Sequence, residues 1–239
     1  VDNFGTMGES PSHPELLDHL AVHFIQQGWS VKKLIRTIVL SRTYRLSSSR
    51  GAQPEDPENR LLAHMNQRRL DAESLRDTML SVSGALDLEM GGATFPANLE
   101  KDVGFQFEAP RRSVYVPVFR SSLPELFEVF DFANSSLVTG RRDISTVAPQ
   151  ALFMMNHPFV RTQATFAAER LLGDSQLKET NRIDHAYLRI LGRHPTLAEI
   201  ALSQEFLKAV IDTTENGRVE AWTQMVQSLF STIDFRYIR

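Results

Sequence analysis

The chain has 239 residues, of which 42% are hydrophobic and 23% charged, so its composition is that of an ordinary globular protein with a sizeable core. Its net charge is −3 and it has no basic tract, so we expect no nucleic-acid partner. The sequence contains no run of about 18 apolar residues, so we expect no membrane-spanning helix within it. Cysteine is absent, which excludes disulfides, thiolate zinc sites, a cysteine nucleophile and covalent attachment of c-type haem within this chain. The first residues carry no secretory signal and are typical of the interior of a longer protein, so we expect a fragment.

The first third of the chain predicts two short amphipathic helices. Apolar residues recur at helical spacing over 14–27, and Gly28 ends that segment. Ser30 is a suitable N-cap for a second helix over 31–41. The apolar residues of this second helix that we expect to be buried are Leu34, Ile35, Ile38 and Val39.

Two further helices are predicted after a polar loop at 47–57. A short one covers 57–65 and a longer one covers 70–83. Arg69 with Glu73, and Glu73 with Arg76, are opposite charges at helical spacing, which is typical of a solvated helix face.

The middle of the chain, about 91–147, predicts a partly irregular insert. Residues 113–119 are β-branched and aromatic, the pattern of a short edge strand, and 98–108 alternates in a way that favours pairing with it in a small ribbon. Proline opens a short helix over 125–132 and another over 149–155.

The remainder is helical, with segments predicted at 159–172, 181–191, 196–213 and 220–231. Thr196 and Glu199 form a capping-box pattern at the start of the third of these segments. The sequence therefore predicts a mainly α fold, a multi-helix orthogonal bundle in a single domain over 1–239, with a small β-ribbon or irregular insert in its middle.

The insert and its flanks hold the densest mixture of polar side chains beside apolar runs. Arginine forks in such a cluster bind carboxylates, sulfate or sugar hydroxyls through planar hydrogen bonds. The alternative is a buried polar network that satisfies irregular backbone, and it is favoured because polar clusters also form where no ligand binds. Asp131 lies near a helix end, the unfavourable end of the helix dipole for a carboxylate, so we expect an arginine partner for it. The candidate binding residues are Arg112, Tyr115, Asp131, Arg142, Gln150 and Asn156.

Other chemistry finds little support. His19 and His23 are four residues apart on the first helix, which would let two imidazoles share a metal, but no His-Glu-x-x-His pattern and no third ligand accompany them. Half-exposed histidines at the edge of an apolar stripe are the alternative. The sequence contains neither a Gly-x-Ser-x-Gly nucleophile turn nor a phosphate-binding glycine loop.

The order of several motifs carries a family resemblance. These segments are 12–18, 28–34, 41–45, 56–62, 68–73, 76–77, 112–115, 130–131, 145–146, 150–152, 186–187 and 191–196, with Asn156. Together they resemble the planctomycete-type C-terminal domain of unknown function found in large, exported, cytochrome-linked (PSCyt-type) proteins. The family usually has proline after the Phe-Asp pair, whereas Phe132 and Ala133 follow here.

The resemblance implies that the parent protein is exported and that no cofactor belongs to this chain, c-type haem being held in another domain. Three functions remain open. The chain binds a glycan, a small anion or other domains of its parent; or it is a catalytic or accessory part of a polysaccharide-acting hydrolase or haem-linked oxidoreductase; or it is purely structural.

Overall fold

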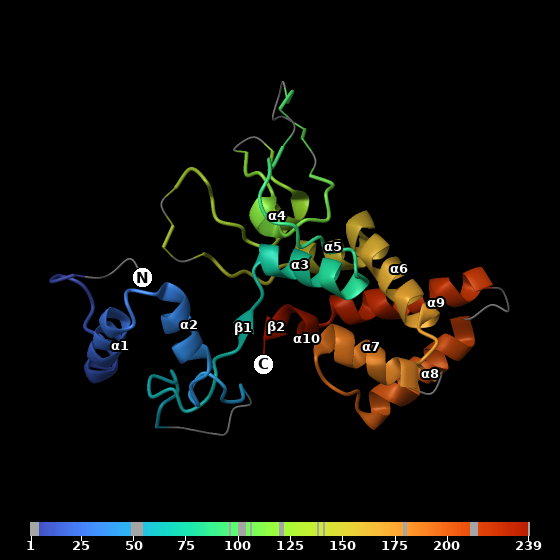
Figure 1. Ribbon diagram of the computed structural model, residues 1–239. Coiled ribbons are helices and arrows are strands. Elements are labelled where there is room, and N and C mark those ends of the chain that lie inside the picture. Colours follow the sequence, from blue (N-terminus) through green and yellow to red (C-terminus); the bar gives the residue numbers. More distant parts are fainter. Residues whose placement is uncertain are drawn as a thin grey trace. The chain divides into compact units, whose positions relative to one another are not determined.

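The computed structural model describes residues 5–48, 55–95, 97–99, 104–105, 107–119, 122–137, 139–140, 142–178, 181–210 and 215–238. The fold is mainly α, as expected, and Figure 1 shows its elements. The chain forms two compact units, Val1–Arg68 (unit 1) and Arg69–Ile238 (unit 2). The single-domain organisation stays a prediction. Within the described ranges, none of the helices combines the length and apolar content needed to cross a lipid bilayer.

Unit 1 begins with α1 (Pro14–Gln26) and α2 (Val31–Val39), both where the sequence predicts them. Gly28 supplies the left-handed turn between them (φ 72°), and the Ser30 hydroxyl accepts the backbone N–H of Lys33 as an N-cap. The expected burial of the α2 stripe is wrong: no residue of either helix is buried, and Ile35 is 52% exposed. Two short helices have too little surface to cover each other's apolar faces.

The helix expected over 57–65 is also wrong, because this segment consists of turns. The Asp56 carboxylate accepts the backbone N–H groups of Arg60 (2.8 Å) and Leu61 (2.7 Å). The buried Asn59 takes a left-handed conformation (φ 52°), and its side-chain amide donates to the His64 carbonyl at 2.7 Å. Side chains of Asp and Asn thus bind the backbone groups that a helix would have paired.

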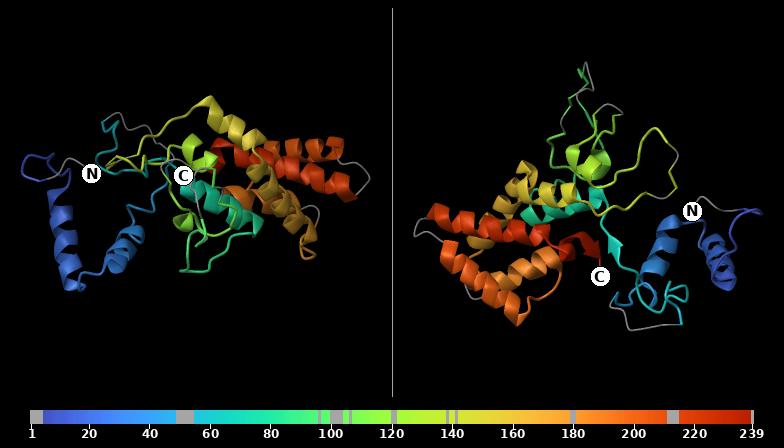
Figure 2. Two further views of the ribbon diagram at one scale, coloured as in Figure 1. Left: turned by 90° about the horizontal axis from the view of Figure 1, so that it is seen from above. Right: turned by 180° about the vertical axis from the view of Figure 1, so that it is seen from behind.

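The core of unit 2 is built on α6 (Pro158–Gly173), which packs against α3 (Ala72–Ser83) and α9 (Glu215–Ser231). Figure 2 shows α6 and α9 side by side in both views. The buried small residues Ala164 and Ala168 on α6 allow a close approach, and the almost fully buried Trp222 and Phe230 of α9 fill the interior.

Helices α5, α7 and α8 complete this bundle at or near the predicted positions. Their bounds are Ala148–Asn156, Arg182–Leu191 and Leu197–Val210. The capping box at the start of α8 is confirmed, because Thr196 N–H donates to Glu199 (2.7 Å) and Glu199 N–H donates to Thr196 Oγ1 (3.3 Å). The predicted extension of α8 to 213 lies outside the described residues.

The two-stranded sheet lies outside the central insert. It joins β1 (Arg68–Arg69) to β2 (Tyr237–Ile238), which follows α10 (Ile233–Arg236). The backbone N–H of Leu70 donates to the Arg236 carbonyl at 2.8 Å. The two ends of unit 2 are thereby held together.

The strand expected over 113–119 is wrong. Ser113–Tyr115 forms a 3-10 turn (η1), and the described part of 98–108 contains no strand; Val103 lies outside the described residues. The reason is that α3 takes the backbone groups a ribbon would use: the Asp77 carboxylate accepts both the N–H and the hydroxyl of Ser113, at 2.8 and 2.6 Å. The short helix α4 (Glu125–Val129) follows Pro124, as predicted, but it ends at Val129 rather than at 132.

Candidate functional site

Two of the six predicted site residues meet in one buried polar network, formed by Arg69, Asp131, Ser145 and Gln150 and called here the closed network. Arg69 Nη2 donates to Asp131 Oδ2 at 2.6 Å, and Arg69 Nη1 donates to the Ser145 carbonyl. The Ser145 N–H and hydroxyl donate to the two oxygens of Asp131, at 2.9 and 2.7 Å. The network thus ties the chain at Asp131 and at Ser145 to Arg69, just before α3.

The expectation that Asp131 has an arginine partner is confirmed by this ion pair, whose side chains are only 5% (Arg69) and 18% (Asp131) exposed. Asp131 itself has a left-handed backbone (φ 59°), the turn that ends α4. Partial burial acts to raise the pKa of Asp131, but hydrogen bonds from Ser145 and Arg69 outweigh it and hold that pKa below its ordinary value. The carboxylate is therefore charged and already paired at neutral pH.

Gln150 closes the network from the first turn of α5. Its side chain is fully buried, and Nε2 donates to the Val129 carbonyl (3.1 Å) and to Ser145 Oγ (3.2 Å). Arg69 Nε is the one atom of these side chains that is buried without a partner in the described part of the chain. A network whose groups are so nearly all satisfied holds the fold in one arrangement and has little left to offer a ligand.

Arg142 lies apart from the closed network and contacts Glu73, a residue of the first turn of α3. It makes a bidentate ion pair with Glu73 (2.6 and 2.8 Å), and its guanidinium carbon lies 4.8 Å from the ring centroid of Phe132. The hydrogen bonds that Arg142 donates to Glu73 raise the pKa of Arg142 above its usual value. The Glu73 pairs expected with Arg69 and Arg76 are wrong, because both arginines are buried against other partners.

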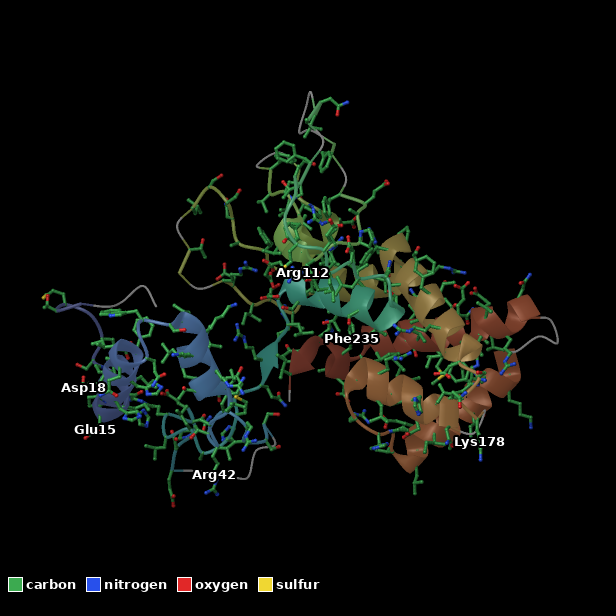
Figure 3. The ribbon with its side chains drawn as sticks, in the orientation of Figure 1. Glu15, Asp18, Arg42, Arg112, Lys178 and Phe235 are labelled. Carbon is green, nitrogen blue, oxygen red and sulfur yellow. The ribbon has the colours of Figure 1, made fainter. Side chains whose placement is uncertain are left out.

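Arg112 and Tyr115 come together at η1, where Arg112 lies 5.7 Å from the Tyr115 ring. The phenol oxygen of Tyr115 accepts the Gly91 N–H at 2.8 Å, so it braces the insert. Figure 3 labels Arg112 at the end of the insert nearest α3. Asn156 is exposed at the C-terminal end of α5. The six predicted residues are thus divided among separate places in unit 2 and do not line one pocket.

Arg76, which the charge pattern places on a solvated helix face, is a buried arginine of α3. Its guanidinium donates to the carbonyls of Arg111 (2.7 Å) and Ala109 (2.8 Å) and faces the rings of Phe107 (5.6 Å) and Phe159 (5.9 Å). Burial lowers the pKa of Arg76, although the neighbouring Asp77 carboxylate opposes this shift. One signal was available: Arg76 shares the helical spacing of the buried residues Met79, Leu80 and Ser83.

Arg76 borders a cavity of about 660 Å³ that opens between α3, α4, α6 and the segment 107–110, called here the aromatic pocket. A volume of this size accommodates a small organic ligand or a sugar unit. Its aromatic lining consists of Phe107, Phe153, Phe159 and Phe166, and its polar lining includes Arg76, Glu108, Glu125, His157, Thr162 and Gln163.

His157 joins α5 to α6 at the edge of the aromatic pocket. Its ring stacks on Phe153 (4.1 Å between centroids), and its Nδ1 accepts the Phe159 N–H at 3.1 Å as the N-cap of α6. Because Nδ1 accepts, the proton of the neutral ring is on Nε2, which faces Glu125 Oε2 at 3.4 Å. The ring therefore has no lone pair free to take a proton from a substrate.

The histidine pair of α1 is present but incomplete as a metal site. The rings of His19 and His23 lie nearly parallel with centroids 6.3 Å apart, and His23 Nε2 is 3.3 Å from Thr37 Oγ1. Among the described residues, no group of three or more His, Asp or Glu side chains is placed to hold an ion.

Among the comparisons with known proteins, a family model matches the chain, and the searches of curated proteins and solved structures find no match. One family model matches residues 1–207, and its description is PSD1, protein of unknown function (DUF1553). The match covers most of the chain and includes the closed network and the aromatic pocket. The chain therefore belongs to the PSD1 (DUF1553) family of proteins of unknown function.

Proposed function

We propose that unit 2 is a ligand-binding module and that the aromatic pocket is its ligand site. The observation that carries this proposal is the cavity itself: about 660 Å³ of space walled by four phenylalanine rings, with polar groups at intervals around it. Binding sites for small molecules have this composition, a mainly apolar wall with a few polar groups that fix orientation.

The ligand class that fits best is a neutral sugar unit. The C–H face of a sugar ring packs against an aromatic ring, and its hydroxyls donate to carboxylates such as those of Glu108 and Glu125. The same carboxylates disfavour an anion, because a second negative charge beside them is repelled. Arg76, the arginine that lines the pocket, already donates to the carbonyls of Arg111 and Ala109.

The state of His157 argues against a role for its ring as a catalytic base. Acid–base catalysis needs a group that exchanges a proton with the substrate, and the ring nitrogens of His157 are taken by Phe159 N–H and by the facing Glu125. The hydrolase and oxidoreductase alternatives stay predictions, as do export of the parent protein, haem in another domain, and binding of the parent's other domains.

The test is a titration of the whole chain with neutral oligosaccharides, followed by the rise in melting temperature that a native-state ligand produces. Phe166→Ser removes a ring that lines the pocket and is 44% exposed, so folding should be retained while affinity falls about tenfold. Phe95→Ser is the matched control, because Phe95 is 45% exposed and does not line the pocket. An equal loss of saccharide affinity in both variants would contradict the proposal. So would a parent chain whose melting temperature does not rise with saccharide.

A further inference from the structure

The hairpin of α1 and α2 with the turns after it, residues 14–46, exposes an unusual amount of apolar surface. No residue of either helix is buried, whereas α3 of unit 2 buries more than half of its length. Isolated exposed apolar residues are normal, but a run of them on two adjoining helices marks an interaction surface. Its large exposed members include Val22, Ile25, Trp29, Val31, Ile35 and Leu40.

The same surface is basic in an otherwise acidic chain. Between Asp18 and Glu55 the sequence contains no Asp or Glu, although the chain as a whole has net charge −3. The cations within this interval that the structure describes are Lys32, Lys33, Arg36, Arg42 and Arg45, none of which is buried. Figure 3 labels Arg42 beyond the end of α2, while the acidic Glu15 and Asp18 lie on the first turns of α1.

Helix α2 separates these two properties onto opposite faces. At 100° per residue, Leu34, Ile35 and Ile38 fall on one side of the helix, and the cations Lys32, Lys33 and Arg36 fall on the other and at its edges. At the turn before α2, Trp29 has a left-handed backbone (φ 59°), meets the Phe24 ring edge-on and leaves 66% of its surface exposed.

We propose that this hairpin docks on the surface of an anionic lipid bilayer, with the apolar faces of the helices entering the headgroup region and the cations meeting lipid phosphates. Basic amphipathic helices with an aromatic residue at the boundary bind membranes in this way. Charge decides between the occupants. A second copy would bring two basic surfaces together, and these repel each other. An anionic bilayer instead attracts the cations and also buries the exposed apolar residues. A nucleic acid would leave the apolar residues uncovered.

The experiment is flotation of the whole chain with vesicles of phosphatidylglycerol and phosphatidylcholine, compared with phosphatidylcholine alone. Binding is expected only to the anionic vesicles, and it should weaken as NaCl rises from about 50 to about 500 mM, because salt screens exposed charges. Tryptophan emission reports the same event. Trp222 is 1% exposed, so a blue shift on binding comes from Trp29 entering the interface.

A triple variant, Lys32→Gln with Lys33→Gln and Arg36→Gln, should bind roughly a hundredfold more weakly. The matched control removes three exposed cations of unit 2, Lys178→Gln with Arg189→Gln and Lys208→Gln, and should bind as the parent chain does. Trp29→Asn keeps a residue that tolerates the left-handed turn and tests the apolar part of the contact; it should weaken binding about tenfold.

Three outcomes overturn the proposal. The first is a lack of specificity, seen either as equal binding to neutral and anionic vesicles or as a unit 2 control variant that loses as much vesicle binding as the α2 triple variant. The second is self-association without vesicles, measured by light scattering and abolished by the α2 triple variant, which would assign the surface to a second copy. The third is a folded, monomeric chain that binds neither vesicle.

Discussion

The closed network and the aromatic pocket are both organised by an arginine of the 69–83 region, yet they differ in what they leave available. Arg69 pairs its guanidinium with Asp131 and the Ser145 carbonyl, and both side chains of this ion pair are largely buried. Arg76 donates to the carbonyls of Arg111 and Ala109 and thereby holds the 109–111 segment at the edge of an open cavity. Arg69 thus holds the chain within a buried network, whereas Arg76 holds the chain beside an open cavity.

This difference separates a scaffold from a binding site. Polar residues gather where irregular backbone must be paired, so a dense polar cluster marks a segment that is difficult to hold in place. A binding site instead needs unfilled volume with few polar groups. The distinction predicts that changes in the closed network alter stability and leave ligand binding intact, whereas changes in the pocket do the reverse.

The largest effect is expected from Asp131→Ala. This change leaves the Arg69 guanidinium buried without its carboxylate and places alanine at a left-handed position (φ 59°). The free energy of unfolding should fall by about 3–4 kcal/mol. The melting temperature should fall by about 10 °C. Urea unfolding measures the first quantity and calorimetry the second.

Asp131→Asn provides the control, because asparagine tolerates the left-handed turn and removes only the charge. It should lose less stability than the alanine variant. A saccharide titration of both folded variants should give the affinity of the parent chain. Unchanged stability together with lost binding would mean that the network, rather than the pocket, is the ligand site.

A smaller effect is expected at a third polar cluster, where Arg193 joins Glu199 of α8 to Asp234 of α10 at 2.6 Å each. Hydrogen bonds from Arg193 lower the pKa of Glu199 to about 2, from an ordinary value of 4.5. The stability gained from this shift is present above pH 4.5 and is lost as the pH falls toward 2, since the folded state then binds its proton later than the unfolded state.

The cluster is about one-third exposed, so solvent screening limits its contribution at pH 7 to about 1 kcal/mol. Arg193→Gln should therefore be less stable than the parent chain by that amount at pH 7, and the difference should shrink when urea unfolding is repeated below pH 4.5. A difference that stays constant with pH would show that Arg193 acts through packing on Tyr187, whose ring it faces at 5.7 Å.

Local rules predicted most of the helical elements correctly. The N-cap of α2 at Ser30, the capping box of α8 and the proline starts of α4 and α5 each depend on residues within a few positions of one another. The arginine partner of Asp131 was also predictable, because a carboxylate at a helix end needs a cation. The sequence did not predict that this arginine would be Arg69, which lies 62 positions earlier in the chain.

The errors over the 113–119 strand and the Glu73 ion pairs share one physical cause, which is competition from groups far away in the sequence. The strand expected at 113–119 gave way to η1 because the Asp77 carboxylate accepts the Ser113 N–H and Arg76 donates to the carbonyl of Arg111, just before the segment. The surface pairs expected for Glu73 failed because Arg142, 69 positions away, competes for the same carboxylate. The aromatic pocket has no local signal at all, since its walls come from four separate segments and its defining property is the volume between them.

The smallest effect is expected from Arg142→Gln, which tests the boundary between scaffold and binding site. The Arg142 side chain is 37% exposed and its partner Glu73 is 25% exposed, so the pair resembles a surface ion pair, and its loss should reduce the free energy of unfolding by about 0.5 kcal/mol. Glu73→Gln should give the same change, because either variant breaks the one bidentate contact. The parent chain and both variants should then show the same change in melting temperature across a sulfate titration. A saturable sulfate shift that Arg142→Gln removes and Glu73→Gln enhances would show that Arg142 binds anions when Glu73 releases it, and it would place a second ligand site beside α3.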